Sequence, residues 1–213
     1  MNIWSVVLNV SPQQQMVLAN LRRLFADACN ELAGIVQETR CWNRVALHHM
    51  TYKKLRQSYP QLGSQMVCNV IYSVCRNARL VYQHPDSPYN IHKTNNAPLP
   101  RLMFGPDSPV YFDKHTLSIL RNHLSMYTLE GRIRFELTIP EPVAERFKNS
   151  GVKEISLENN TENALVLRFI FLEKNQTNED ESALKQAGSL QVMPSFISVQ
   201  NTLHAPMLTG LSQ

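Results

Sequence analysis

The chain has 213 residues, and apolar residues make up 43% of them, which is enough for a hydrophobic core. No run approaches the roughly 20 apolar residues that a membrane span needs, and the start of the chain lacks the features of a secretion signal, so no membrane partner is expected. The net charge of +4 is uneven, because residues 1–100 carry ten Lys/Arg against four Asp/Glu. Four cysteines without a CxxC pair argue against a zinc ribbon or a redox dithiol, and we expect a cytoplasmic protein.

The first predicted element is a strand over residues 3–10, where β-branched and aromatic residues dominate. A long helix is expected to follow, because Ser11, Pro12 and Gln14 supply an N-cap, a proline at the first helical position and a capping-box partner. Its apolar residues recur at the spacings of a core-facing stripe. They are Val17, Leu21, Leu24, Phe25, Ala28, Leu32, Ile35 and Val36.

Two more helices are predicted next. One lies within residues 42–59, where Thr51 is able to cap a short piece, and the other follows a turn at residues 60–63 and is capped by Ser64. The later helix has a valine-rich stripe for the core and a polar strip on another face. This strip consists of Tyr72, Arg76, Arg79 and Gln83.

Residues 84–109 contain six prolines, which predicts an irregular connection before short strands return. Residues 165–172 are nearly all apolar and predict a central strand. Residues 174–189 are polar and acidic, which is typical of a linker, and one more strand is expected within residues 190–199. The other expected strands cover residues 102–104, 110–112, 116–120, 132–139 and 152–157, with a helical turn at residues 140–149.

The order is therefore one strand, a block of helices and a run of strands. The first strand has to pair with strands that follow the helices, because no others are available. This order predicts an α+β fold, since helices and strands do not alternate. We expect residues 1–10 and 98–173 to form a β-domain, residues 11–97 a helical insert, and residues 174–213 a polar linker and C-terminal tail.

No motif for catalysis or for a cofactor is recognisable. The chain has no Gly-rich phosphate loop, no GxSxG and no HExxH. His48 and His49 are adjacent and so point to different faces, which argues against a shared metal ion. The acidic residues between 101 and 173 are scattered near turns and strand ends, and no pair stands out as metal-binding or acid–base carboxylates. We expect no cofactor and no metal site, and no residue identifies the chain as an enzyme.

The combination of basic and aromatic residues in the helical block favours binding to nucleic acid. Guanidinium and ammonium groups neutralise phosphates, and planar rings stack on unpaired bases. The alternative is that the rings belong to the core and the charges only solvate a helical surface. The predicted contact residues are Arg40, Arg44, Tyr52, Lys53, Lys54, Arg56, Tyr72, Arg76 and Arg79, with Lys114, Arg132 and Arg134 from the strand region.

Four longer sequence segments occur in an order that resembles that of a known protein family. They are LNVSPQQQMVLANLRRLFADACNELAGIV, YKKLRQSYPQLGSQMVCNVIYSVCRNA, VYFDKHTLSI and SMYTLEGRIRFELTIP. Together they cover roughly residues 5–173 and resemble the N-terminal half of TnpB-type proteins, the transposon-encoded RNA-guided nucleases related to small type V CRISPR effectors. The matching positions are Gln13–Gln15, Asn30, Tyr52, Leu55, Arg56, Pro60, Leu62, Ser64, Gln65, Thr128, Leu129, Gly131, Arg132 and Ile133.

The resemblance implies a wedge domain, an oligonucleotide-binding-type β-barrel, with a helical recognition domain inserted after its first strand. In the family these parts hold guide RNA and the guide–target duplex. The family's RuvC nuclease carboxylates and zinc module have no counterpart among residues 174–213, whose only acids are Glu179, Asp180 and Glu181. The resemblance therefore implies a non-catalytic subunit or remnant of a prokaryotic, nucleoid-associated RNA-guided system.

Structured guide-type RNA is the expected partner of such a protein. Target DNA and a separate chain bearing the nuclease domain are further candidate partners. The alternative is a protein–protein assembly module of the same fold that does not bind RNA. The salt dependence of binding distinguishes the two functions. Binding to RNA phosphates weakens steeply as the salt concentration rises, whereas an apolar protein interface responds little.

Overall fold

A computed structural model describes residues 2–93, 97–120, 123–172, 194 and 196–200 of the chain. A short strand, β1 (Ile3–Val7), comes first and is followed by three helices. These are α1 (Pro12–Thr39), α2 (Arg44–Ser58) and α3 (Ser64–Tyr82). The remaining elements are β2 (Arg101–Phe104), β3 (Val110–Phe112), β4 (Leu117–Leu120), β5 (His123–Thr128), β6 (Gly131–Glu136), α4 (Glu141–Asn149), β7 (Val152–Asn159), β8 (Leu165–Phe171) and β9 (Ile197–Gln200).

The start of α1 confirms the predicted capping box. The Ser11 hydroxyl accepts a hydrogen bond from the Gln14 backbone N–H at 3.2 Å, and the Gln14 side chain accepts one from the Ser11 N–H at 2.9 Å. These bonds satisfy two backbone donors that the first helical turn leaves without partners. The helix ends at Arg40, whose left-handed backbone (φ 51°) stops the helical hydrogen-bond pattern.

The two capping predictions for the later helices were wrong. The side chain of Asn43 accepts a hydrogen bond from the Ala46 N–H at 3.0 Å, so α2 begins there and runs without a break. Thr51 therefore lies inside α2, where its hydroxyl donates to the Leu47 carbonyl at 2.6 Å. Helix α3 has Gly63 at its N-cap position with no side-chain cap, and Ser64 is its first residue.

The largest sheet confirms the pairing expected for the first strand. Its order is β1-β8-β7-β3 and all its pairs are antiparallel. Strand β1 lies at the edge, with Ile3 opposite Ile170 and Val7 opposite Val166 of β8. The apolar segment 165–172 thus supplies a central strand, as its composition predicts.

Two smaller sheets complete the described strands. One has the order β4-β5-β6, and the other pairs β2 with β9. Strand β5 was not expected, although its buried Leu124 and Met126 alternate with more exposed residues. Strand β9 is the described end of the segment expected at residues 190–199. The linker expected at residues 174–189 lies outside the described residues.

The fold class is α+β with antiparallel sheets. The three sheets share no hydrogen-bonded strand, and in the described part of the chain they do not close into one barrel. A turn held by Asp113 separates β3 from β4, because its carboxylate accepts hydrogen bonds from the N–H and hydroxyl of Thr116. In this turn the chain leaves the first sheet for the next.

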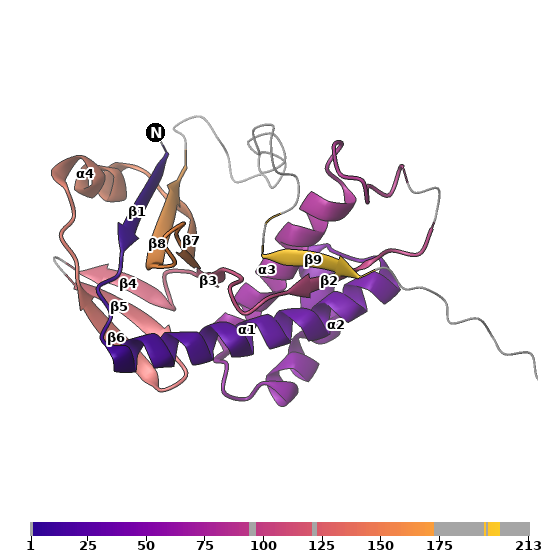
Figure 1. Cartoon of the computed structure of the whole chain (residues 1–213), viewed down its shortest axis with the longest axis horizontal. Helices are drawn as coiled ribbons and strands as arrows, with labels where there is room; N and C mark the ends of the chain where they lie inside the picture. Colours follow the sequence, from indigo (N-terminus) through magenta and orange to yellow (C-terminus); the bar gives the residue numbers. More distant parts are fainter. Residues whose placement is uncertain (1, 94–96, 121–122, 173–193, 195, 201–213) are drawn as a thin grey trace, which may run out of the picture.

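Helices and strands share one buried core. It joins Phe25 of α1 and Val74 of α3 to Phe169 of β8 and Met126 of β5. Figure 1 shows most strands and α4 at one end of the molecule and α2 and α3 at the other, with α1 running along both. Among the described residues, no helix combines the length and the apolar character needed to cross a membrane.

Candidate nucleic-acid interface

A long stretch of the helical block contains no carboxylate. Residues 39–85 hold seven Lys/Arg and no Asp or Glu. They include all of α2 and α3, so every carboxylate that pairs with these cations has to come from another part of the fold. The positions of these carboxylates decide which cations are already paired and which can still neutralise the charge of a ligand.

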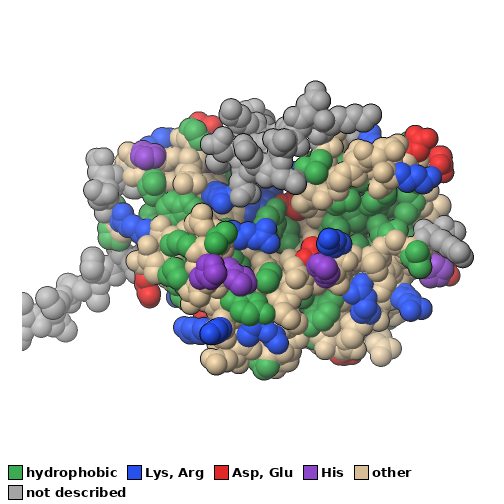
Figure 2. All heavy atoms as spheres, turned by 180° about the vertical axis from the view of Figure 1, so that it is seen from behind, with side chains coloured by type: hydrophobic (Ala, Val, Ile, Leu, Met, Phe, Trp, Pro, Cys, Tyr) green, Lys and Arg blue, Asp and Glu red, His purple; other side chains and the backbone are tan. Residues whose placement is uncertain are grey.

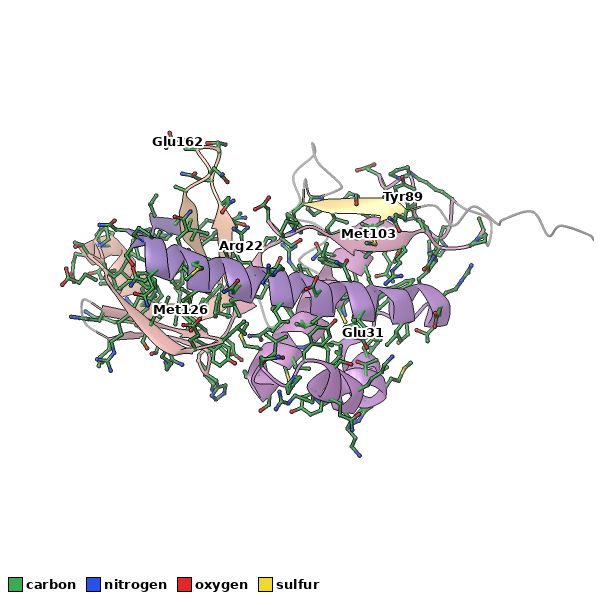
Figure 3. The ribbon with its side chains drawn as sticks, turned by 60° about the horizontal axis from the view of Figure 1, so that its bottom comes forward. Arg22, Glu31, Tyr89, Met103, Met126 and Glu162 are labelled. Atoms are coloured by element: carbon green, nitrogen blue, oxygen red, sulfur yellow. The ribbon has the colours of Figure 1, made fainter. Side chains whose placement is uncertain are left out.

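The predicted cations of α2 differ in their partners. Arg44 and Lys53 are exposed, and neither forms an ion pair with any described residue. Lys54 lies 3.4 Å from Glu31 of α1, a residue labelled in Figure 3. The Arg56 guanidinium donates a hydrogen bond to the Leu62 carbonyl, and so it is held against the turn that leads into α3.

Aromatic rings lie beside these cations on α2. Arg44, His48, Tyr52 and Arg56 follow one another at intervals of four residues, so they form a ridge along the helix. The rings of His48 and Tyr52 are stacked, with centroids 4.7 Å apart and 23° between their planes. Arg44 lies over the ring of Tyr72 from α3, 5.3 Å from its centroid.

Tyr72 and Arg76 have a partner inside the protein. The Glu154 carboxylate of β7 accepts a hydrogen bond from the Tyr72 hydroxyl at 2.6 Å and another from the Arg76 Nε at 2.9 Å. Burial, helped by Glu154, raises the pKa of Tyr72. Burial acts to lower the pKa of Arg76, but Tyr111 and Glu154 outweigh it and raise that pKa. Both groups therefore keep their ordinary protonation states while they fix α3 to the sheet.

Two other predicted arginines lie at the ends of helices. Arg40, at the end of α1, is exposed and donates a hydrogen bond to the Ala97 carbonyl at 2.8 Å. Arg79 is half-buried in the last turn of α3. Neither belongs to the ridge on α2.

The predicted cations of the strand region lie on the outer face of the β4-β5-β6 sheet or beside it. Arg132 is exposed, yet its guanidinium is held by the Ser125 hydroxyl at 2.9 Å and by the His115 carbonyl at 3.2 Å. Arg134 lies two residues further along β6, so its side chain is on the same face. Lys114 is exposed in the turn that leads into β4.

Hydrogen bonds join the turn after α2 and the start of α3 to the strand region that carries these cations. The Tyr127 hydroxyl of β5 donates to the Gln61 carbonyl at 2.8 Å and accepts from the Gly63 N–H at 2.9 Å. The Gln65 side chain of α3 donates to Asp113, next to Lys114. We call the combined surface the basic face and define it as Arg44, His48, Tyr52 and Arg56 with Lys114, Arg132 and Arg134.

Figure 2 shows one face of the molecule, on which Lys and Arg side chains spread over both the helical half and the strand half. Hydrophobic and histidine side chains lie between them, and Asp and Glu side chains are fewer. Of the predicted contact residues, Arg44, Tyr52 and Arg56 lie along one ridge of α2, and Arg132 and Arg134 lie on one face of β6. Lys114 lies in the turn before β4. Lys54 instead pairs with Glu31 at the surface, and Tyr72 and Arg76 bind the carboxylate of Glu154.

Sequence reasoning missed three residues with functional chemistry. His48 was considered only as a metal ligand, although its four-residue spacing to Tyr52 is the signal that predicts a stacked pair. Arg168 is the lone charge within the apolar strand β8, and this was a readable signal. Glu158 had no such signal, because its position beside Arg168 depends on the pairing of β7 with β8.

Comparison with protein-family models finds no matching family, and comparison with curated proteins finds no match. Among the described residues, no group of three or more His, Cys, Asp or Glu side chains is placed to hold a metal ion. The four cysteines are free thiols, and Cys29 and Cys75 are buried.

Proposed function

We propose that this protein binds nucleic acid through the basic face and catalyses no reaction. The observation that carries the proposal is the acid-free segment 39–85, which presents the exposed Arg44 and the ring-stacked Tyr52. The same segment is hydrogen-bonded at Gly63 to Tyr127, which lies in the sheet that carries Arg132. Cations without carboxylate partners attract phosphates and release counterions when they bind them. Half-exposed rings offer stacking surfaces to unpaired bases. Structured RNA, which presents both groups, fits this surface best.

We further propose that the protein is a non-catalytic subunit or remnant of an RNA-guided system of the TnpB type. The order of one strand, inserted helices and later strands that pair with the first supports a wedge-like β-domain with a recognition insert. On this proposal the β-domain is related to the oligonucleotide-binding barrel, and a separate nuclease-domain chain completes the system. Sequencing the RNA that co-purifies with the protein from its host tests this proposal, and a random sample of cellular RNA would refute it.

Salt-dependent binding tests the proposed contact residues. The probe is a fluorescein-labelled RNA stem-loop, and the variants are Arg44→Gln and Arg134→Gln. Each should lower affinity and reduce the slope of log affinity against log salt by about 0.7 to 0.9 for each phosphate that the variant no longer neutralises. Lys148→Gln is the matched control, because it removes the same charge from exposed α4 (Figure 1).

Equal slopes for the three variants and the unaltered protein would contradict the proposed interface. Tight binding to a protein partner that does not respond to salt would instead favour an assembly module. Two exposed apolar side chains on α2 could supply a protein-binding surface for that second function. Val45 is 66% exposed and Met50 is 52% exposed. Replacing both with serine should then abolish protein binding and leave RNA binding unchanged.

A further inference from the structure

A cavity of about 330 Å³ opens on one face of the largest sheet, and no residue of the basic face lines it. Its lining comes from β1, β8 and β7 and from the turn after β7, and consists of Ser5, Val7, Glu158, Asn159, Asn160, Val166 and Arg168. Strand pairing explains why these side chains meet. Val7, Val166 and Glu158 lie side by side in one row across three strands, and Ser5 is opposite Arg168 in the next row.

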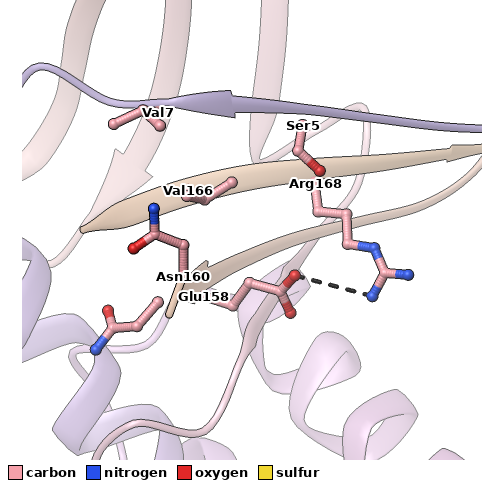
Figure 4. A pocket seen from close by; sticks show the side chains of 7 residues that line it. Ser5, Val7, Glu158, Asn160, Val166 and Arg168 are labelled. Atoms are coloured by element: carbon pink, nitrogen blue, oxygen red, sulfur yellow. Dashed lines mark ion pairs between the residues drawn. The ribbon is translucent and has the colours of Figure 1, made fainter. Parts of the chain in front are cut away.

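The cavity has an apolar floor and a charged wall. Val166 is buried and Val7 is 58% exposed, so the two side chains form a shelf that a flat ring can cover. The carboxylate of Glu158 and the guanidinium of Arg168 lie next to each other at the cavity, 3.8 Å apart (Figure 4). That separation is longer than a hydrogen bond.

Both charged groups therefore keep hydrogen-bonding capacity for a ligand. Among the described residues, neither the Glu158 carboxylate nor the Arg168 guanidinium forms a hydrogen bond. Asn159 differs, because its side chain is fully engaged with Arg22, Asp107 and Asn163. In this cavity an acceptor and a donor lie next to each other above an apolar surface.

We propose that this cavity binds a single unpaired guanine base of the nucleic acid. Guanine carries two adjacent N–H donor groups on its Watson–Crick edge, which suit one carboxylate, and its O6 acceptor beside them suits a guanidinium. Adenine offers a carboxylate only one such donor group, and uracil places acceptors on both sides of its single N–H. The cavity is large enough for a purine ring stacked on Val7 and Val166.

The inference rests on the proposed function, because the base has to be delivered by a bound strand. Side-chain contacts connect the ridge on α2 to this sheet: Arg44 lies over Tyr72, Tyr72 and Arg76 bind Glu154, and Glu154 lies on the same face of β7 as Glu158. On this proposal, a strand held by its phosphates on α2 extends to the sheet and places one base in the cavity.

Single-base replacement in a labelled oligonucleotide tests the inference. The probes are uridine 12-mers with a central G, A, C or inosine, and affinity is measured by fluorescence anisotropy at one salt concentration. The G probe should bind roughly five- to a hundredfold more tightly than the A and C probes, the range for one bidentate base contact. Inosine lacks the N2 amino group of guanine and should bind with intermediate affinity.

Variants assign the preference to the cavity. Glu158→Gln should reduce the preference for G to within about twofold, because the amide cannot accept both donors of guanine. Glu162→Gln is the matched control, since it removes the same charge from an exposed side chain in the neighbouring turn (Figure 3). Arg168→Lys keeps the charge but loses the planar fork of guanidinium donors, so it should weaken the preference as well.

The outcomes separate the two proposals. Equal affinity for the four probes, preference for C, or a G preference that survives Glu158→Gln would overturn the guanine site, while salt-dependent binding would still support the proposed function. If no probe binds at any salt concentration, the proposed function fails and the guanine site fails with it.

Discussion

Replacing Glu154 with glutamine should lower the free energy of unfolding by about 2 kcal/mol. The carboxylate of Glu154 accepts hydrogen bonds from Tyr72 at 2.6 Å and Arg76 at 2.9 Å, and its side chain is only 9% exposed. Hydrogen bonds to charged groups contribute about 1.5 to 3 kcal/mol each, so the two bonds together contribute about 3 to 6 kcal/mol. Glutamine keeps one neutral acceptor, and water reaches the 29% exposed Arg76, which reduces the loss to about a third to a half.

Urea unfolding followed by circular dichroism measures this change at neutral pH. Tyr72→Phe removes only one of the two bonds and should cost about 1 to 1.5 kcal/mol. The double variant should cost less than the sum of the single variants, because both substitutions remove the same hydrogen bond. Glu162→Gln is the control for the removal of a surface charge. If Glu154→Gln costs no more than this control, Glu154 does not fix α3 to the sheet.

Three further changes test the fold and the cavity. Gly131→Ala should cost about 1 to 2 kcal/mol and lower the melting temperature by about 2 to 8 °C, because Gly131 has a φ of 106° that alanine rarely adopts. Phe147→Ala should cost about 2 to 3 kcal/mol in urea unfolding, since it removes the ring contacts with Trp4 and Phe169 that hold α4. Burial raises the pKa of Glu158 above 4.5, so the folded protein binds this proton more tightly and loses stability as pH rises through the folded pKa. Glu158→Gln should therefore increase stability at pH 7 and leave it unchanged at pH 4, and equal effects at both pH values would contradict this.

Local patterns were sufficient to predict the parts of the fold that short-range contacts determine. Helix α1 could be predicted because Ser11, Pro12 and Gln14 act within one turn. The pairing of β1 with a later strand followed by elimination, since no other strand was available. The expected cap at Thr51 failed because Asn43 starts α2 a full two turns earlier.

The partners of the cations could not be predicted from the sequence. Tyr72 and its partner Glu154 are 82 residues apart, and no spacing rule connects them. The same holds for Tyr127, which joins β5 to the turn at Gln61 from 66 positions away. Residue type identified the cations. The tertiary fold decides which of them are paired within the protein and which can still contact a ligand.

Two carboxylates of β7 have different roles because α3 covers only part of the sheet. Glu154 and Glu158 point to the same face, four residues apart. Tyr72 and Arg76 of α3 lie over the β3 and β7 side of that face, so Glu154 is used to hold the helix. The cavity over β1 and β8 lies beyond this helix, so Glu158 and Arg168 face it without hydrogen-bonded partners among the described residues. A substitution that stabilises the packing of α3 should therefore leave the guanine preference unchanged, whereas one at Glu158 should remove it.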